Sequence, residues 1–108
     1  IEMKVIIKDN IVYKIGQNAQ ENWDLLDNSA NFVWFHLRSF PSCHVVVETE
    51  DITEDVVVEG ANLCLKNTKY RNLKNVKVNY TPLKNIKKAD TIGAVHFISN
   101  KKVRTITI

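Results

Sequence analysis

The sequence predicts an α+β fold in which a mostly antiparallel sheet carries two helices packed on one of its faces. Three observations predict this class: the 108 residues suit one domain, short runs of β-branched and aromatic residues recur, and two segments have helical spacing of apolar residues. With 44% hydrophobic and 25% charged residues, and no apolar run of about 18 residues, the composition excludes a disordered chain and a membrane-spanning helix. We expect one compact domain over residues 1–108, in which Ile1 and Glu2 are left over from cloning.

The first half of the chain is predicted to contain a hairpin, a helix and two buried strands. Asp9-Asn10 favours a tight turn, Asn18 and Glu21 are the residue types of a capping box, and the segment 32–37 is aromatic and β-branched. The predicted elements are strands over 4–8 and 11–15, a helix over 18–28, and strands over 32–37 and 45–48.

The second half is predicted to add one longer helix and three strands. Thr53 and Glu54 suit a helix N-terminus, and Lys66 suits the C-terminal end of the helix dipole. Gly60, inside this helix, lowers its stability by about 1 kcal/mol relative to Ala. The predicted elements are a helix over 54–67, an alternating strand over 76–80 that Pro82 ends, and two strands over 91–98 and 103–108 around a hairpin turn at 99–102.

Charge is distributed unevenly along the chain. Residues 1–60 contain 4 Lys or Arg and 11 Asp or Glu, whereas residues 61–108 contain 11 Lys or Arg and one Asp, so a net charge of −7 is followed by +10. Much of the acidic charge lies at predicted helix starts, where capping and the helix dipole explain it. The second half therefore predicts a polyanion as the first partner to consider.

The basic residues of the second half are predicted to form one face. Lys84, Lys87 and Lys88 stand at i, i+3 and i+4, so they project together if residues 83–89 form a helical turn. Such a face can neutralise several phosphates without base preference, and a solvated lysine-rich surface is the alternative explanation. The candidate phosphate-binding residues are Lys77, Lys84, Lys87, Lys88, Lys101, Lys102 and Arg104.

A second candidate set follows an aromatic strand. After Trp34-Phe35 come His36 and Arg38, whose imidazole and guanidinium groups can bind phosphate or stack on a base, and His44 starts the next predicted strand. If the two strands pair, His36 and His44 lie close together at one end of the sheet. Half-buried histidines satisfied by backbone groups are the alternative, and Trp34 and Phe35 are expected in the core.

The two cysteines favour neither a metal site nor a disulfide framework. Cys43 and Cys64 lack metal-ligand spacing, and we expect two reduced thiols in a cytoplasmic protein. Cys43 beside His44, with Glu21 or Asp24 as an orienting acid, has the residue types of a nucleophile and base. Adjacent strand residues point to opposite faces, however, so we do not expect Cys43 to act as a nucleophile with His44. We also expect no other catalytic residue, no metal and no cofactor.

Four segments of the chain match, in order, the motifs of a known family. They are Gly16-Gln17-Asn18-Ala19-Gln20-Glu21-Asn22, Trp34-Phe35-His36-Leu37-Arg38, Ser42-Cys43-His44-Val45, and Val76 to Pro82 with Lys87-Lys88. Over residues 11–108 the chain resembles the NFACT-R domain, the RNA-binding domain of the NFACT proteins of ribosome-associated quality control. Its later part is similar to small coiled-coil-containing eukaryotic members.

The resemblance implies binding to structured RNA, such as transfer or ribosomal RNA, and no catalytic activity. The family's paired histidines correspond to His36 and His44, its Glu-Asn pair to Glu21 and Asn22, its Arg to Arg38 and its late basic pair to Lys87 and Lys88. The motif residues expected to support the structure are Gly16, Asn18, Glu21, Asn22, Trp34 and Phe35.

Two positions depart from the family pattern. Phe32 stands where the family usually has Asp, and Ser42-Cys43 replaces a usual Gly-Ser before the second histidine. These departures affect the loop that leads to His44.

The leading hypothesis is a stand-alone RNA-binding module that binds tRNA or rRNA through one basic face, with DNA as a possible competitor and no membrane partner. One alternative is a protein-interaction module whose acidic half docks on a ribosomal or other basic partner. Another is an enzyme that acts on a nucleic acid with His36 and His44 as acid and base. Oligomeric state stays open.

Overall fold

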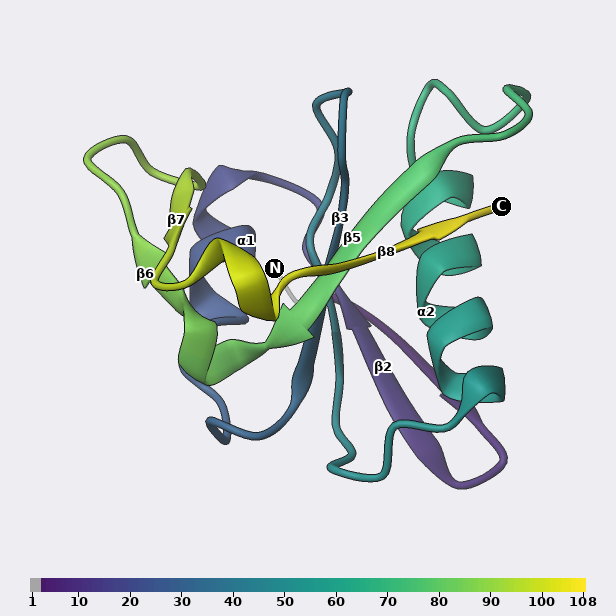
Figure 1. Ribbon diagram of the computed structural model, residues 1–108, viewed down its shortest axis with the longest axis horizontal. Coiled ribbons are helices and arrows are strands. Elements are labelled where there is room, and N and C mark those ends of the chain that lie inside the picture. The colour runs from purple at the N-terminus through teal and green to yellow at the C-terminus, as the bar shows by residue number, and fades with distance from the viewer. Residues whose placement is uncertain (1–2) are drawn as a thin grey trace.

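The computed structural model describes residues 3–108, so the expectation that Ile1 and Glu2 are left over from cloning falls outside the described residues. The strands are β1 (Lys4–Lys8), β2 (Ile11–Ile15), β3 (Val33–Leu37), β4 (Val45–Val47), β5 (Lys77–Pro82), β6 (Ile86–Lys88), β7 (Val95–Phe97) and β8 (Arg104–Thr107), and the helices are α1 (Ala19–Asp24) and α2 (Glu54–Lys66). Six strands form an antiparallel sheet in the order β1-β2-β4-β3-β5-β8, and β6 pairs with β7 separately (Figure 1). The predicted α+β class is confirmed.

The N-terminal hairpin and the starts of both helices follow the sequence prediction. Asp9 and Asn10 have φ angles of 51° and 64°, the left-handed values that both central residues of a type I′ turn require. Side chains of Asn18 and Thr53 cap the first turns of α1 and α2. α1 ends at Asp24 and is therefore shorter than predicted.

The two helices lie on opposite faces of the main sheet, which corrects the prediction that both pack on one face (Figure 1). Side chains alternate along β3, so Phe35 and Leu37 pack with buried residues of α2, whereas Trp34 packs with Leu25, which follows α1. In β3 only His36 is not fully buried. Such a continuously apolar strand requires cover on both faces of the sheet.

The segment 83–89 does not form the predicted helical turn. It consists of a single 3₁₀ turn at Leu83–Asn85 followed by β6. β6 pairs with β7, while β8 pairs with β5 in the main sheet, so the predicted hairpin of the last two strands is also wrong. A second 3₁₀ turn, Asn100–Lys102, joins the two sheets.

The buried amide of Asn85 explains this connection. Its Oδ1 accepts a hydrogen bond from the backbone N–H of Ser99 at 2.8 Å, and its Nδ2 donates to the carbonyl of Ser99 at 2.9 Å. Nδ2 also lies 3.1 Å from Oγ1 of Thr81, in β5. Because one side chain binds both backbone groups of Ser99, the chain after β7 is held at the end of β5 and continues beside it as β8.

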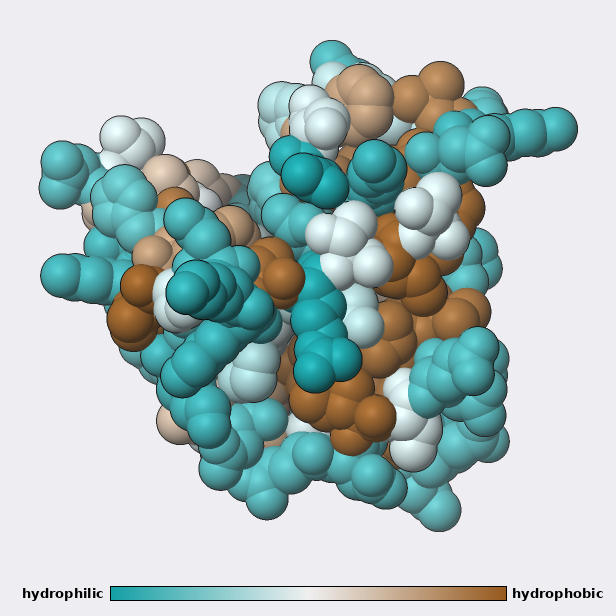
Figure 2. Space-filling view, in the orientation of Figure 1, coloured by the Kyte–Doolittle hydropathy of each residue, from teal (hydrophilic) through white to brown (hydrophobic). Residues whose placement is uncertain are grey.

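One face of the molecule carries an apolar area. Figure 2 shows hydrophobic side chains gathered between β8 and α2, with hydrophilic side chains around them. In the described part of the chain no helix has both the length and the apolar character needed to cross a membrane, since α2, the longer of the two, has 13 residues.

Candidate nucleic-acid interface

A cleft of about 790 Å³ lies beside the N-terminal end of α2 and strands β5 and β8. Four exposed cationic residues line it, and Glu54 is the one acid among its described lining residues. The cations are Lys84 after β5, Lys101 and Lys102 in the 3₁₀ turn before β8, and Arg104 in β8. These four residues define the basic cleft, whose rim has the charge to bind phosphate groups.

The lining of the basic cleft also contains apolar and aromatic groups. Ile52 and Ile106 contribute aliphatic surface, and Tyr80 contributes a ring that stacks on Phe35 with centroids 5.7 Å apart and an interplanar angle of 22°. A nucleic-acid strand could therefore place phosphates at the rim and a sugar or base against this surface. These residues come from separate segments and carry no motif, so the sequence alone does not predict them as part of a site.

His36 and His44 lie together, as predicted if their strands pair. β3 and β4 are antiparallel neighbours, and the two imidazole centroids are 5.2 Å apart at an angle of 86°. The indole Nε1 of Trp34 donates a hydrogen bond to Nδ1 of His44 at 3.1 Å, and the Trp34 ring is parallel to that of His36. Both histidines line a second surface pocket of about 640 Å³, here named the histidine pocket.

Both imidazoles are neutral at pH 7. Burial lowers the pKa of His44 to about 3, and repulsion by His36 adds to this shift, while a hydrogen bond with the backbone of Asn22 opposes it. Burial also lowers the pKa of His36, against the opposing effect of a hydrogen bond with the carbonyl of Leu37. Because a carbonyl only accepts, the proton of neutral His36 lies on Nδ1 and its Nε2 is an acceptor. The histidine pocket thus offers hydrogen bonds rather than positive charge.

The turn between β2 and α1 holds His44 in place. Gly16 N–H donates to the carbonyl of His44 at 3.0 Å, and Oδ1 of Asn22 accepts from the N–H of His44 at 3.0 Å. A Cβ atom on Gly16 would lie 2.1 Å from that Asn22 oxygen, so only glycine fits there. Glu21 is buried, and its carboxylate accepts the N–H of Gln17 at 2.9 Å. The residues of the predicted Gly16–Asn22 motif therefore support the histidine pocket from within.

The predicted basic residues do not share one face. Arg38 and Lys77 are neighbours, joined by a 2.9 Å hydrogen bond from Arg38 N to the carbonyl of Lys77. The register of β5 and β8 pairs Tyr80 with Arg104 and Lys77 with Thr107, so Lys77 and Arg104 point to opposite faces of the sheet. Arg38 and Lys77 thus form a group separate from the basic cleft.

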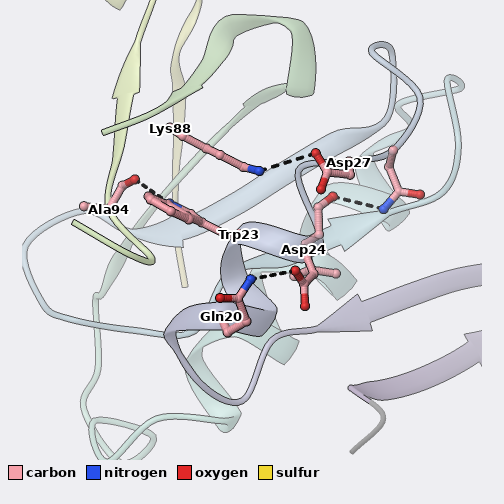
Figure 3. Close-up of polar contacts among 8 residues, drawn as sticks. Gln20, Trp23, Asp24, Asp27, Lys88 and Ala94 are labelled. Carbon is pink, nitrogen blue, oxygen red and sulfur yellow. Dashed lines mark hydrogen bonds and ion pairs between the residues drawn. The ribbon is translucent and has the colours of Figure 1, made fainter. Parts of the chain in front are cut away.

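The two lysines of β6 also lie outside the basic cleft. Nζ of Lys88 is 3.5 Å from the carboxylate of Asp27 and 5.5 Å from the ring centroid of Trp23, whose indole donates to the carbonyl of Ala94 at 2.9 Å (Figure 3). Lys87 is the next residue along the same strand, so its side chain points the other way. The predicted projection of Lys84, Lys87 and Lys88 from one helical turn is therefore wrong.

The cysteines do not form a nucleophile–base pair with His44. Sγ of Cys43 contacts the backbone carbonyl of Cys64 at 3.6 Å, and Nδ1 of His44 is occupied by Trp34. Within residues 3–108, no three His, Cys, Asp or Glu side chains are placed so that they could hold a metal ion.

A small α+β domain with a basic cleft has the charge that a polyanion-binding domain requires. The family model described as NFACT protein RNA binding domain matches residues 4–97. This match covers most of the chain, and the chain therefore belongs to that family of RNA-binding domains.

Individual relatives agree with this assignment. Coiled-coil domain-containing protein 25 of Bos taurus is 33% identical over 104 residues, which cover 87% of this chain and 50% of that protein. The Rqc2 homolog RqcH of Bacillus subtilis is 28% identical over 76 residues, covering 68% of this chain and 13% of the bacterial protein. The chain thus spans half the length, or less, of these relatives.

A solved structure shares the fold. The C-terminal part of the fibronectin/fibrinogen-binding protein from Streptococcus suis aligns with a TM-score of 0.89 over 100% of this chain and 46% of that chain. The sequence identity is 21%, so this likeness concerns the fold alone.

Proposed function

We propose that this domain binds a structured RNA, such as a transfer or ribosomal RNA, through the basic cleft, and that it acts in the cytoplasm in translation or ribosome-associated quality control. The observation that carries the proposal is the convergence of Lys84, Lys101, Lys102 and Arg104 on one cleft of an RNA-binding family member. The proposal includes binding by this domain alone, which is supported by the location of all four cations in one folded unit.

The histidine pocket has a different role in this proposal. His36 and His44 are uncharged at pH 7, so they add no attraction for phosphate. Nε2 of His36 can instead accept a hydrogen bond from a base or a ribose hydroxyl. We propose no catalytic step, because Nδ1 of His44 already accepts the hydrogen bond of Trp34 and has little capacity to take a proton.

A protein-interaction role for the acidic half ranks second. Many of its acidic side chains are already engaged within the molecule and are less available to a basic partner. These contacts are Asp24 with Gln20, Asp27 with Lys88, Glu48 with Lys14, Glu50 with Asn31 and Glu59 with Lys8.

A salt titration of tRNA binding tests the proposal. The test variant changes all four cations of the basic cleft, Lys84, Lys101, Lys102 and Arg104, to Gln. We expect it to bind tRNA at least about tenfold more weakly. The slope of log affinity against log salt should be smaller by about three to four units. A DNA duplex of the same length is the competitor, because phosphate contacts alone do not distinguish it from RNA.

The matched control removes the same charge elsewhere. The control residues are exposed and lie at or beyond the C-terminal end of α2, which is about 18 Å along the helix from its N-terminal end. They are Lys66, Lys69, Arg71 and Lys74. Their change to Gln should leave most of the affinity and the slope intact. Equal losses in the two fourfold variants would show that net charge, rather than the basic cleft, determines binding.

A further inference from the structure

The two cysteines lie against each other where the segment before β4 meets α2. Sγ of Cys43 is 3.6 Å from the carbonyl oxygen of Cys64, and Sγ of Cys64 is 3.5 Å from the carbonyl oxygen of Cys43. These reciprocal contacts bring together two thiols that are 21 positions apart in the chain. Both thiols are free.

The two thiols differ in accessibility. Cys43 is partly exposed and lines the histidine pocket, whereas Cys64 is buried in α2. A hydrogen bond from the Cys64 thiol lowers the pKa of Cys43, while that bond and burial raise the pKa of Cys64 well above its usual value. The outer sulfur is thus the one that deprotonates and meets solutes first.

We propose that Cys43 and Cys64 form an oxidation site, at which a peroxide converts the two thiols into an intramolecular disulfide that links the segment before β4 to α2. This proposal goes beyond the proposed function and does not rest on it.

The reaction balances in two steps. The Cys43 thiolate attacks one peroxide oxygen, the O–O bond breaks, and hydroxide leaves and takes a proton to become water, so that Cys43 becomes a sulfenic acid. Sγ of Cys64 then attacks the sulfur of Cys43, the S–O bond breaks, and the leaving hydroxide takes the Cys64 proton. Two thiols are oxidised to one disulfide, and one peroxide is reduced to two waters.

The cross-link should stabilise the fold. It closes a loop between residues 21 positions apart and so restricts the unfolded chain. It also fixes the residue directly before His44 to α2, on the wall of the histidine pocket.

The experiment treats the reduced, full chain with hydrogen peroxide and follows intact mass, free thiols and thermal unfolding. We expect both thiols to disappear together, the monomer mass to fall by two hydrogen atoms, and the Tm to rise by roughly 5–15 °C, all reversed by dithiothreitol. Retention of both thiols, or their loss through a dimer linked between chains, would overturn the proposal.

Two serine variants separate the roles of the thiols. Cys64→Ser should trap Cys43 as a sulfenic acid that reacts with dimedone and should show no rise in Tm. Cys43→Ser should leave Cys64 unreactive, because that thiol is buried. The two variants each retain one thiol, and their rates of oxidation by peroxide can be compared. If the Cys64 thiol and the Cys43 thiol react equally fast, the assigned order of attack is wrong. Should either variant not fold, the mass of the oxidised wild-type chain still decides the proposal.

Discussion

The indole Nε1 of Trp34 donates a hydrogen bond of 3.1 Å to Nδ1 of His44 inside the domain. Because an indole nitrogen only donates, Nδ1 of His44 is unprotonated, and the proton of the neutral ring lies on Nε2. This bond fixes the tautomer of one histidine of the histidine pocket and has consequences for stability that can be measured.

The burial of His44 beside Trp34 predicts that stability falls as the solution becomes acidic, because burial is the main cause of the lowered pKa of this histidine. The pKa of His44 is about 3 in the folded chain and 6.5 in the unfolded chain, so between these values only the unfolded state gains the proton. The free energy of unfolding should therefore decrease by about 1.4 kcal/mol for each pH unit below 6.5. Urea denaturation between pH 7 and pH 5 measures this slope.

The control for this pH dependence is His44→Asn, whose Oδ1 can replace Nδ1 as the acceptor for Trp34 but does not titrate. We expect the slope of its unfolding free energy against pH to be smaller by about 1.4 kcal/mol per pH unit, which corresponds to the uptake of one proton. His36 contributes to the remaining slope, since burial lowers its pKa as well. Identical slopes in the two proteins would contradict the assignment to His44.

The close approach of Gly16 to Asn22 predicts strong coupling between these two positions. A methyl group at Gly16 displaces the Asn22 oxygen that binds the N–H of His44. Gly16→Ala and Asn22→Ala should each lose about 2 kcal/mol of unfolding free energy, because each leaves that N–H without its partner. The double variant should lose clearly less than the sum in chemical denaturation, and additive losses would show that the two changes act separately.

Gly60 predicts an exception to helix propensity. In an exposed helix, Gly→Ala stabilises by about 1 kcal/mol, but a Cβ at Gly60 would lie 2.5 Å from Cζ of Phe35. We expect Gly60→Ala to destabilise the domain by about 1–3 kcal/mol, as overpacking of a core does. Adding Phe35→Leu should recover part of this loss in the same denaturation assay, whereas a stabilised Gly60→Ala variant would refute the close contact.

The amide of Asn85 predicts a link between stability and RNA binding. Asn85→Ala removes the three hydrogen bonds that hold Ser99 and Thr81, so we expect a loss of about 2–3 kcal/mol and faster amide exchange at Ser99. The loosened chain carries two cations of the basic cleft, so tRNA affinity should also fall. Asn100→Ala, at an exposed neighbouring position, is the control and should change neither property.

Local chemistry explains most of the elements that the sequence predicts. The Asp9-Asn10 turn and the caps at Asn18 and Thr53 each depend on residues close together in the chain. Within the candidate site, the pairing of His36 with His44 could be predicted because only a short connection separates their strands.

Contacts between distant segments explain the errors. Residues 83–89 have helical spacing of lysines, but pairing with β7 makes part of this segment a strand. The register of β5 and β8 separates Lys77 from Arg104, and no local pattern specifies a register between strands joined by a long connection.

By itself, then, the sequence determined the α+β class, the antiparallel hairpin, both helix starts and the motifs that indicate an RNA-binding family. Only the tertiary structure decided which helix covers which face, which four cations share a cleft, and that Cys43 meets Cys64. The physical reason is that backbone turns, caps and side-chain alternation are set by neighbouring residues, whereas a shared cleft or a thiol pair depends on how strands far apart in the chain pack together.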